Sequence, residues 1–483
     1  MRIQSIQRIA GILIMISSLT MLPPALVGLI YADGSTVAFL EGFSVLLVLG
    51  ALAWFPVRKV RREFRIRDGF LVVVTCWTVL GLTGAVPLLL SQYPSLSVTD
   101  AVFESVSGLT TTGATVLTNI DSLPKGVLFY RQQLQWLGGM GIVVLAVAVL
   151  PMLRIGGMQL YRAETPGPMK DNKLTPRIAE TAKALWYLYL GFTVLCALAY
   201  WMAGMSLFDA ICHAFSTVAI GGFSTHDLSI GYFDSPVIEM IAVVFMAAAG
   251  VNFALHFLAW RRASMSPYLG DYELKWYLVI LGIGIIFCVA GLLFSGTHPS
   301  FGEALRYGLF QAVSVATTTG FTTDSFYLWP GALPLILLLL SCIGACAGST
   351  GGGIKVVRGV LLYRQGVREI MRLVHPAAVA PVKMGRKKMP ESVIQSVWGF
   401  FSLYVACLCV LSVLMTTFGL DLETGVSAVL ACLNNLGPAL GGAGPHYADL
   451  APPAKWFLAL AMIMGRLELF TLLVLFTPTF WKD

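Results

Sequence analysis

The chain has 483 residues, of which 57% are hydrophobic and 12% are charged, and its mean hydropathy is +0.79. These values are typical of an integral membrane protein and exclude a soluble protein with a large core. The net charge of +7 does not indicate a nucleic-acid partner, because the basic residues are concentrated in a few loops between apolar segments.

Ten apolar segments reach the length of about 20 residues that a helix needs to cross a bilayer. The first resembles a signal peptide, but its apolar region is too long and no Ala-x-Ala site follows, so we expect a retained span. The ten segments are residues 9–31, 36–57, 69–91, 126–151, 181–204, 235–259, 275–296, 329–362, 393–418 and 453–477.

Four further apolar segments are too short to cross the membrane. A helix of about 14 residues reaches only about 20 Å, so we expect each segment to enter the membrane and stop near its middle. Irregular backbone at that depth is tolerated only where it is buried in protein or lines water. These half-helices are predicted at residues 99–112, 206–220, 303–319 and 423–436.

A short glycine-containing stretch ends each half-helix. The four stretches are Leu109–Thr115, Ala219–Ser224, Ala316–Thr322 and Asn434–Ala439, and their alignment puts Gly113, Gly222, Gly320 and Gly437 in register. A single stretch of this kind is usually a turn. Four of them in equivalent positions indicate four sides of one pore.

The chain therefore contains four units of span, half-helix, glycine-containing loop and span. Because each half-helix enters from the same side, we expect parallel units around an axis along the membrane normal. The predicted fold is all-α, with ten transmembrane helices, eight of them in the four repeats around a central pore. The predicted divisions are 1–68 for two extra spans and a basic loop, then repeats at 69–180, 181–274, 275–392 (with a broken second span) and 393–483.

The basic loops predict the orientation in the membrane. Lysines and arginines gather at residues 58–67, 154–177, 261–262 and 355–388, in loops that alternate along the chain. By the positive-inside rule these loops are cytoplasmic, so both termini are cytoplasmic and the half-helices enter from outside.

The carboxyl end of each half-helix then points to the membrane centre and carries roughly −0.5 of an elementary charge. Four such ends favour a cation, and the loops that follow can turn carbonyl oxygens toward it in place of water. Glycine suits a loop that needs positive φ and no side chain in the pore. Threonine beside it supplies a hydroxyl that bonds locally.

This plan, with one filter glycine per repeat, resembles the Trk/Ktr/HKT superfamily of potassium transporters, and the two leading spans resemble its bacterial TrkH branch. The resemblance implies K⁺ as the transported ligand, a multi-pass protein of the bacterial cytoplasmic membrane, and an ion held by main-chain oxygens just before each filter glycine. The implied residues are Thr111, Thr112, Ile220, Gly221, Thr318, Thr319, Asn435 and Leu436. The second and fourth stretches depart from Thr-Thr-Gly, which leaves open whether the four sides bind equally. Sodium-favouring plant relatives often have serine at the first filter glycine, so Gly113 favours potassium.

A glycine-rich run interrupts the eighth span between Gly344 and Gly353. Each glycine costs a helix about 1 kcal/mol relative to alanine, so the helix should break there. The run lacks the Gly-Lys-Ser/Thr of a phosphate loop, so a nucleotide site is not expected. It is either a close-packed interface of small residues or a flexible loop below the filter. The resemblance implies the second, an intramembrane gating loop with Gly344, Gly348, Gly351, Gly352 and Gly353.

Arg466 falls near the middle of the tenth span, where an arginine costs roughly 2.5–3.5 kcal/mol on insertion scales. It is either a structural arginine tied to carbonyls of the broken eighth span or a fixed positive charge in the pore beneath the filter. The resemblance supports the second role. Glu468 lies on a different face of the helix and is not its intrahelical partner.

The leading function is potassium uptake driven by the membrane potential. A sodium- or proton-coupled symporter of the same architecture and a non-transporting receptor subunit are the alternatives. An enzyme is not expected, because Glu239, Glu273 and Glu468 are scattered and unaccompanied. No zinc site, disulfide framework or organic cofactor is indicated. The resemblance also implies a homodimer and a TrkA-like, nucleotide-binding regulatory subunit on the basic cytoplasmic face.

Overall fold

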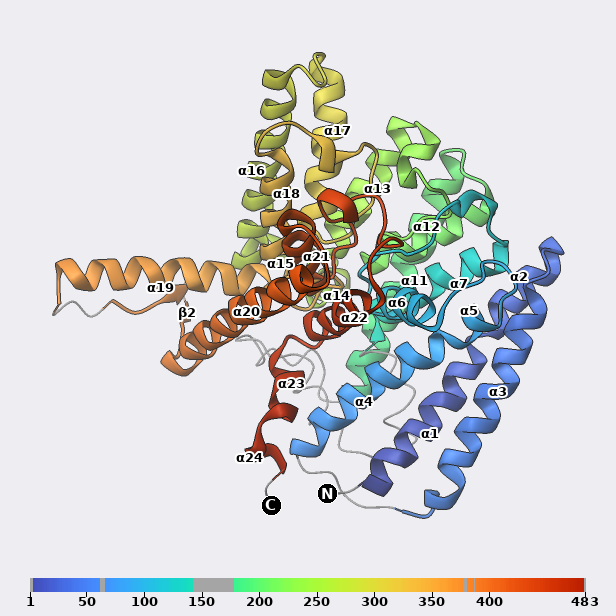
Figure 1. The fold of residues 1–483 in the computed structure, drawn as a ribbon. Helices are drawn as coiled ribbons and strands as arrows, with labels where there is room; N and C mark the ends of the chain where they lie inside the picture. Colours follow the sequence, from blue (N-terminus) through green and yellow to red (C-terminus); the bar gives the residue numbers. More distant parts are fainter. Residues whose placement is uncertain (1–2, 61–65, 142–177, 377–379, 386, 482–483) are drawn as a thin grey trace.

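The structure is a computed structural model, and it describes residues 3–60, 66–141, 178–376, 380–385 and 387–481. Within these ranges the chain is helical apart from its loops and one short hairpin (Figure 1). Some predictions fall on other residues. These are the second part of the fourth span (142–151), the basic segment 154–177, and Arg61, Arg62, Arg65 and Arg386.

The first two predicted spans form a closely packed pair of helices. The first span is α1 (Ile3–Leu19) followed by α2 (Leu22–Tyr31), which has prolines in its first turn, and the second span is α3 (Thr36–Trp54). A Cβ atom added at Gly11 or at Gly50 would lie 2.8 Å from backbone nitrogen of the opposite helix. These glycines therefore permit the close approach that is common between membrane helices.

The remaining elements follow in four groups along the chain. The first contains α4 (Ile66–Gly84), α5 (Val86–Leu90), α6 (Val98–Leu109) and α7 (Lys125–Gly139). The second contains α11 (Ile178–Met202), α12 (Leu207–Ala219), α13 (Pro236–Ala249), α14 (Phe253–Arg262) and α15 (Ser266–Gly270). The third contains α16 (Tyr272–Ser295), α17 (Phe301–Ala316), α18 (Leu333–Ile343), α19 (Val356–Val374) and the antiparallel strands β1 (Lys383–Met384) and β2 (Lys387–Lys388). The fourth contains α20 (Glu391–Thr417), α21 (Leu422–Asn434), α22 (Pro452–Arg466), α23 (Phe470–Leu473) and α24 (Pro478–Trp481).

Eight of the ten predicted spans are recognised by length and apolar character in the described part of the chain. In the described part of the chain, six helices are long and apolar enough to cross a membrane, and up to eight if each of two bent pairs counts as one span. The fourth predicted span lies partly outside the described residues, and α7 is its described part. The eighth is divided between α18 and α19. The four predicted half-helices are present as α6, α12, α17 and α21.

Two spans bend sharply at breaks in their helices. The axes of α13 and α14 differ by 93°, and Asn252 begins α14 by accepting a hydrogen bond from the Ala254 N–H. The tenth span bends by 108° after α22, where Glu468 and Leu469 both have positive φ. Two such residues in succession are incompatible with a continuing right-handed helix.

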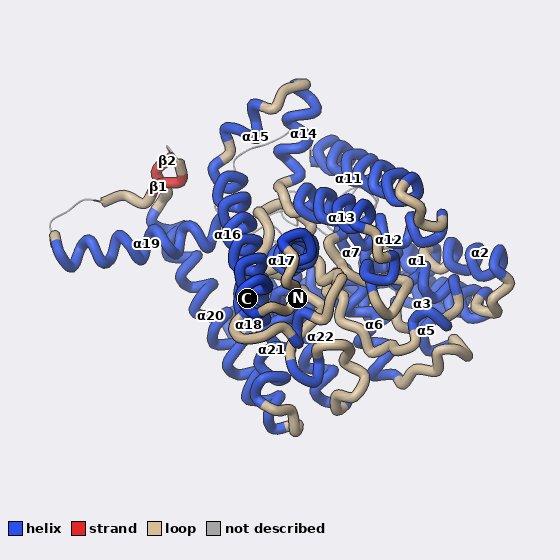
Figure 2. Tube along the Cα trace, turned by 90° about the horizontal axis from the view of Figure 1, so that it is seen from above, coloured by secondary structure: helices blue, strands red, loops and turns tan. Residues whose placement is uncertain are grey.

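The second part of the predicted eighth span extends beyond its expected end. Helix α19 continues to Val374, so residues 363–374, predicted as basic loop, are helical. Together with the β1–β2 hairpin, it projects from the body of the molecule as an arm (Figures 1 and 2). Arg368 in α19 binds Glu391 at the start of α20 at 2.7 Å, which ties the arm to α20.

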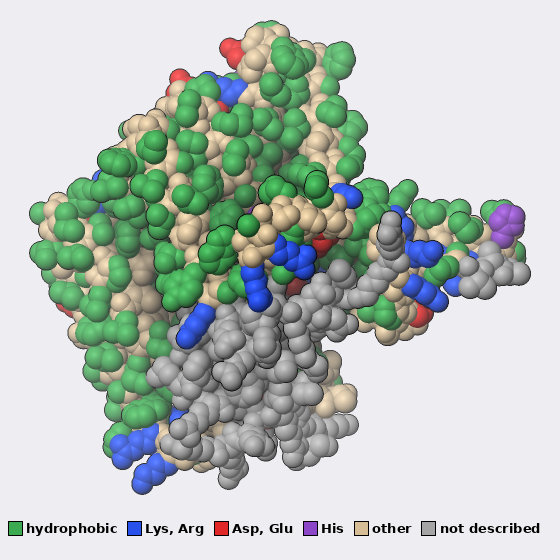
Figure 3. All heavy atoms as spheres, turned by 180° about the vertical axis from the view of Figure 1, so that it is seen from behind, with side chains coloured by type: hydrophobic (Ala, Val, Ile, Leu, Met, Phe, Trp, Pro, Cys, Tyr) green, Lys and Arg blue, Asp and Glu red, His purple; other side chains and the backbone are tan. Residues whose placement is uncertain are grey.

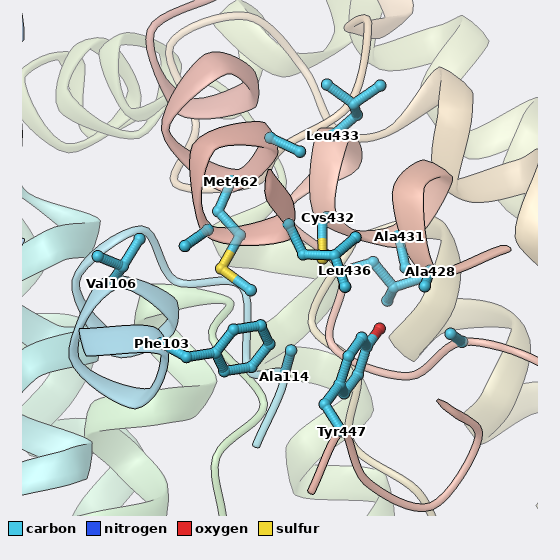
Figure 4. Packing of buried hydrophobic residues seen from close by; sticks show 14 of the residues in the cluster. Phe103, Val106, Ala114, Ala428, Ala431, Cys432, Leu433, Leu436, Tyr447 and Met462 are labelled. Carbon is cyan, nitrogen blue, oxygen red and sulfur yellow. The ribbon is translucent and has the colours of Figure 1, made fainter. Parts of the chain in front are cut away.

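The surface and the core fit a membrane environment. The face in Figure 3 is largely hydrophobic, and lysines and arginines gather toward its lower part and on the arm. The largest buried cluster lies where α6, α21 and α22 meet, and Figure 4 shows Phe103, Met462 and Leu436 converging there. The cluster includes Leu109, Val315 and Leu433, near the ends of α6, α17 and α21.

Candidate functional site

The four half-helices begin with the same local structure. At each start, a side-chain oxygen accepts a hydrogen bond from the backbone N–H three residues later, at 3.0–3.2 Å. This arrangement satisfies an otherwise unpaired N–H of the first turn. The four pairs are Ser97 with Asp100, Ser206 with Asp209, Ser300 with Glu303, and Asp421 with Thr424.

The half-helices also end alike. A residue with positive φ follows each helix, and the next N–H donates to a carbonyl five residues back at 2.8–2.9 Å. This six-to-one hydrogen bond is a common helix ending, usually with glycine at the left-handed position. The residues here are Thr111 (φ 55°), Ile220 (φ 56°), Thr318 (φ 65°) and Asn435 (φ 53°). Four non-glycine residues in this uncommon conformation indicate a shared backbone requirement.

The four aligned glycines share their position but not their φ. Gly113, Gly222 and Gly320 have φ of 79°, 80° and 83°, as expected for loops that require glycine. Gly437 is different, because its φ lies outside the left-handed region and Pro438 follows it. The expectation of positive φ is therefore wrong for the fourth glycine.

The loops around these glycines contact one another in a closed ring. We call residues 110–114, 219–223, 317–321 and 434–438 the first to fourth glycine loops. A Cβ atom at Gly113 would overlap the Gly221 carbonyl oxygen, and one at Gly222 would overlap the carbonyl of Thr319. A Cβ at Gly320 would lie 2.7 Å from Pro438, and one at Gly437 would lie 2.5 Å from the Gly113 carbonyl. Each loop thus packs against the next, and the fourth packs against the first.

All eight residues predicted to supply main-chain oxygens are buried in this ring. One of the eight oxygens already has a protein donor: the Gln135 Nε2 group on α7 donates to the Gly221 carbonyl at 2.6 Å. The Gln135 Oε1 atom also accepts a hydrogen bond from the Phe223 N–H at 3.1 Å.

A buried ion pair supports the first two loops from outside the ring. Arg131 Nε lies 2.8 Å from Glu104 Oε1, and the two side chains are 1% and 0% exposed. Arg131 also donates to the Ser224 carbonyl at 3.2 Å and to the Thr115 hydroxyl at 3.1 Å. Glu104 accepts a hydrogen bond from the Val116 N–H at 2.9 Å. Glu104, Arg131 and Gln135 were not among the residues predicted to form the site. The sequence does contain a sign of these residues, because each is a polar side chain within an apolar segment that should face lipid or protein.

The glycine-rich run of the eighth span lies directly beneath the ring. Its N–H groups at Gly352 and Gly353 donate to the Thr318 hydroxyl at 2.7 Å and to the Asn434 carbonyl at 3.1 Å. The Thr350 hydroxyl donates to the Val218 carbonyl at 3.0 Å. The run therefore contacts the ends of three half-helices, and it pairs carbonyls that would otherwise lack a donor at two of them, Val218 and Asn434.

Arg466 meets this run from the tenth span. Its guanidinium donates to the Thr350 carbonyl at 3.0 Å and to the Gly138 carbonyl of α7 at 2.7 Å. The structure therefore ties Arg466 to a carbonyl of the broken eighth span. It also brings the charge of Arg466 next to the part of the run that touches the half-helices.

Glu273 holds the base of the run, a role that sequence reasoning missed. Its Oε1 atom accepts hydrogen bonds from the Ala347 N–H at 2.8 Å and from the Val357 N–H at 3.1 Å. One carboxylate oxygen therefore joins the glycine-rich run to the first turn of α19. The description of the three glutamates as unaccompanied is wrong. Glu239 binds Arg306 at 2.7 Å, and Glu468 binds Arg358.

A second ionic cluster joins the loops that follow α6 and α12. His226 Nδ1 binds the Asp121 carboxylate, and its Nε2 lies 3.5 Å from Asp209 Oδ1. Burial lowers the pKa of His226, but its contacts with the two carboxylates raise it more, so the net pKa is above the usual 6.5. The cluster therefore favours a protonated His226.

The architecture defines the class of protein to which the chain belongs. It is a multi-pass helical membrane protein in which re-entrant half-helices bring four loops into one ring, an arrangement used to select ions. The TrkH family of cation transport proteins matches residues 35–482. The chain belongs to this family, and it is a transporter and not an enzyme.

The chain aligns over its whole length with the whole length of two curated relatives. The Trk system potassium uptake protein TrkH of Halomonas elongata is 54% identical, and its namesake from Vibrio parahaemolyticus is 55% identical. The crystal structure of the potassium transporter TrkH from Vibrio parahaemolyticus superimposes with a TM-score of 0.91 over all of both chains at 52% identity.

Proposed function

We propose that this chain takes up potassium across the bacterial cytoplasmic membrane through the ring of four glycine loops. The relatives that match its full length are potassium uptake proteins. The observation that carries the proposal is the closed ring, since it brings together the carboxyl ends of four half-helices. Each end contributes roughly −0.5 of an elementary charge, so their meeting point favours a cation.

The ion is held by main-chain oxygens of the eight predicted residues, two before each aligned glycine. Carbonyl oxygens can replace the hydration shell of K⁺, and glycine keeps side chains out of the path. The common ending of the half-helices supports this proposal, because the same backbone conformation recurs on the four sides. The four repeats of the chain are the units that supply these sides.

The gate is the glycine-rich run at residues 344–353 together with Arg466. The run blocks the path below the ring, and its glycines allow it to move away. The hydrogen bonds from Gly352, Gly353 and Thr350 to the half-helices support this role, because they hold the run against the ring. The positive charge of Arg466 adds a barrier to cations at the same depth.

The proposed partners are those that the family resemblance implies. The arm and the basic loops offer a cytoplasmic surface for a TrkA-like regulatory subunit, and the functional unit is a homodimer. Both termini are cytoplasmic, with the half-helices entering from outside. The gathering of lysines and arginines in Figure 3 supports this orientation.

Electrical recording from purified protein in a lipid bilayer tests the transport function. Potassium, sodium and proton gradients are varied separately. A potassium current that reverses at the potassium equilibrium potential supports uptake through the ring, and a reversal potential that shifts with the proton or sodium gradient supports coupled symport. Absence of potassium flux from folded protein would overturn the proposal.

Substitutions at Arg466 separate the two parts of the proposed gate. Arg466→Ala removes both the charge and the hydrogen bonds to Thr350 and Gly138, and it should raise potassium flux without the regulatory subunit. Arg466→Lys keeps the charge but cannot reproduce the planar geometry. If the charge is the barrier, the lysine variant stays slow. If anchoring of the run is decisive, it conducts like the alanine variant. Wild-type flux in both variants and in a deletion of Gly351–Gly353 would show that the run is packing and not a gate.

A further inference from the structure

The second glycine loop lacks the polar side chains that support the other three. In the first and third loops, two threonine hydroxyls bond to each other at 2.8 Å. In the fourth loop, the Asn435 amide donates to the Thr112 hydroxyl at 3.1 Å and to the Met462 carbonyl at 2.8 Å. Residues 219–223 of the second loop are alanine, isoleucine, two glycines and phenylalanine.

Gln135 supplies this missing support from a neighbouring helix. Its amide donates to the Gly221 carbonyl and accepts from the Phe223 N–H, so its two hydrogen bonds lie on either side of Gly222. The side chain is fully buried. A polar side chain in such a place is costly unless both of its ends are paired, as they are here.

Gly221 and Gln135 are fitted to each other. The three atoms nearest to a Cβ added at Gly221 all belong to the amide of Gln135. The φ of Gly221 lies outside the left-handed region, so alanine is compatible with its backbone. The space taken by Gln135 is therefore what requires glycine at this position.

We propose that Gln135 is the positioning residue of the second glycine loop and a determinant of ion selectivity, a proposal that rests on the proposed function. The contacts of the ring explain how it acts. Gly113 packs on the Gly221 oxygen that Gln135 holds, and Gly222 packs on the Thr319 oxygen. A shift of the second loop therefore moves its neighbours on both sides. The departure of this loop from Thr-Thr-Gly is compensated by a side chain from the preceding repeat.

Gln135→Leu tests the proposal, because leucine is of similar size and makes neither hydrogen bond. Loss of two hydrogen bonds of ordinary strength changes the balance between loop conformations by about thirtyfold. We expect the ratio of potassium to sodium uptake in proteoliposomes to fall by a similar factor, with little change in the maximal rate. The matched control is Gln133→Leu on the same helix. Gln133 is also buried, but its amide donates to the Thr20 carbonyl of the first span. An unchanged ratio in folded Gln135→Leu protein would overturn the proposal.

A second pair of variants keeps the test decisive if Gln135→Leu does not fold. Gly221→Ala should lower the melting temperature and uptake, and Gly221→Ala with Gln135→Ala should recover part of both, because alanine frees the space but makes neither hydrogen bond. A double variant whose melting temperature and uptake are no higher than those of Gly221→Ala would show that Gly221 and Gln135 are not fitted to each other. The melting temperature is measured without ion flux, so it separates failure of this inference from failure of the transport proposal. Absence of wild-type uptake would overturn only the latter.

Discussion

The buried pair Glu104–Arg131 should contribute strongly to stability, and Arg131→Met measures that contribution. Glu104 is fully buried, and in the variant it keeps its hydrogen bonds from the Val116 N–H and the Thr115 hydroxyl but loses its cation. Removing one partner of a buried ion pair typically costs about 3–5 kcal/mol, because the remaining charge is uncompensated. We expect a loss of this size in the free energy of unfolding.

Two further variants show whether the pair itself is responsible. Glu104→Gln with Arg131→Met removes both charges and should recover most of the loss. Arg372→Met breaks the exposed pair between Arg372 and Glu369, whose side chains are 44% and 50% exposed. An exposed pair of this kind is worth about 1 kcal/mol or less, so the variant should unfold like the wild type.

Unfolding is followed in mixed micelles as a function of denaturing detergent, with the same lipid content for each variant. The reasoning is refuted if the free energy of unfolding of Arg131→Met lies within about 1 kcal/mol of the wild-type value, since a buried unpaired carboxylate should destabilise the protein by more than that. It is also refuted if the double variant is no more stable than Arg131→Met.

Three other predictions concern the ring, the orientation and the outer loops. Gly113→Ser should relax potassium selectivity more than Gly320→Ser, measured as competing sodium uptake, because the first added Cβ meets a backbone carbonyl and the second a proline ring. In a cysteine-free background, a cysteine at Lys59 should react with an impermeant reagent only after permeabilisation, and one at Asp227 should react in intact cells; the reverse pattern would overturn the orientation. The pKa of His226 is raised in the folded state, so protonated His226 stabilises the fold fully below pH 6.5, and this stabilisation is lost as the pH rises through the folded-state pKa. The melting temperature should therefore fall between about pH 6 and 10. In His226→Gln the melting temperature should depend less on pH over this range.

The helical framework was predictable because its signals are local. The length of an apolar run gives a span, and a run too short for the bilayer gives a half-helix, so α6, α12, α17 and α21 lie close to their expected positions. The break in the eighth span followed from the density of glycines between Gly344 and Gly353. The kink after α13 could not be predicted in this way, because it depends on hydrogen bonds with a distant segment. There, the Cys346 N–H donates to the Gly250 carbonyl at 2.9 Å, and the Phe253 N–H donates to the Gly348 carbonyl at 3.1 Å.

In the candidate site too, local features could be predicted from the sequence and long-range contacts could not. The alignment of Gly113, Gly222 and Gly320 follows from spacing along the chain, and the structure gives these residues nearly the same φ. The supports of the ring are contacts between residues far apart in sequence, such as Gln135 with Gly221 or Glu273 with Val357. Spacing carries no information about such contacts. A polar residue in an apolar span shows only that some partner is required.

The four half-helix ends share a left-handed residue but not a set of supporting side chains. Threonine pairs support two sides, Asn435 supports the fourth, and Gln135 supports the second from another repeat. An ion held by main-chain oxygens depends on where the carbonyls lie and not on the side chains that hold them there. The ring therefore tolerates a change of supporting side chain if another group holds the loop backbone in the same place. This accounts for the second stretch of the sequence departing furthest from Thr-Thr-Gly while its left-handed residue and its glycine keep the φ values of the first.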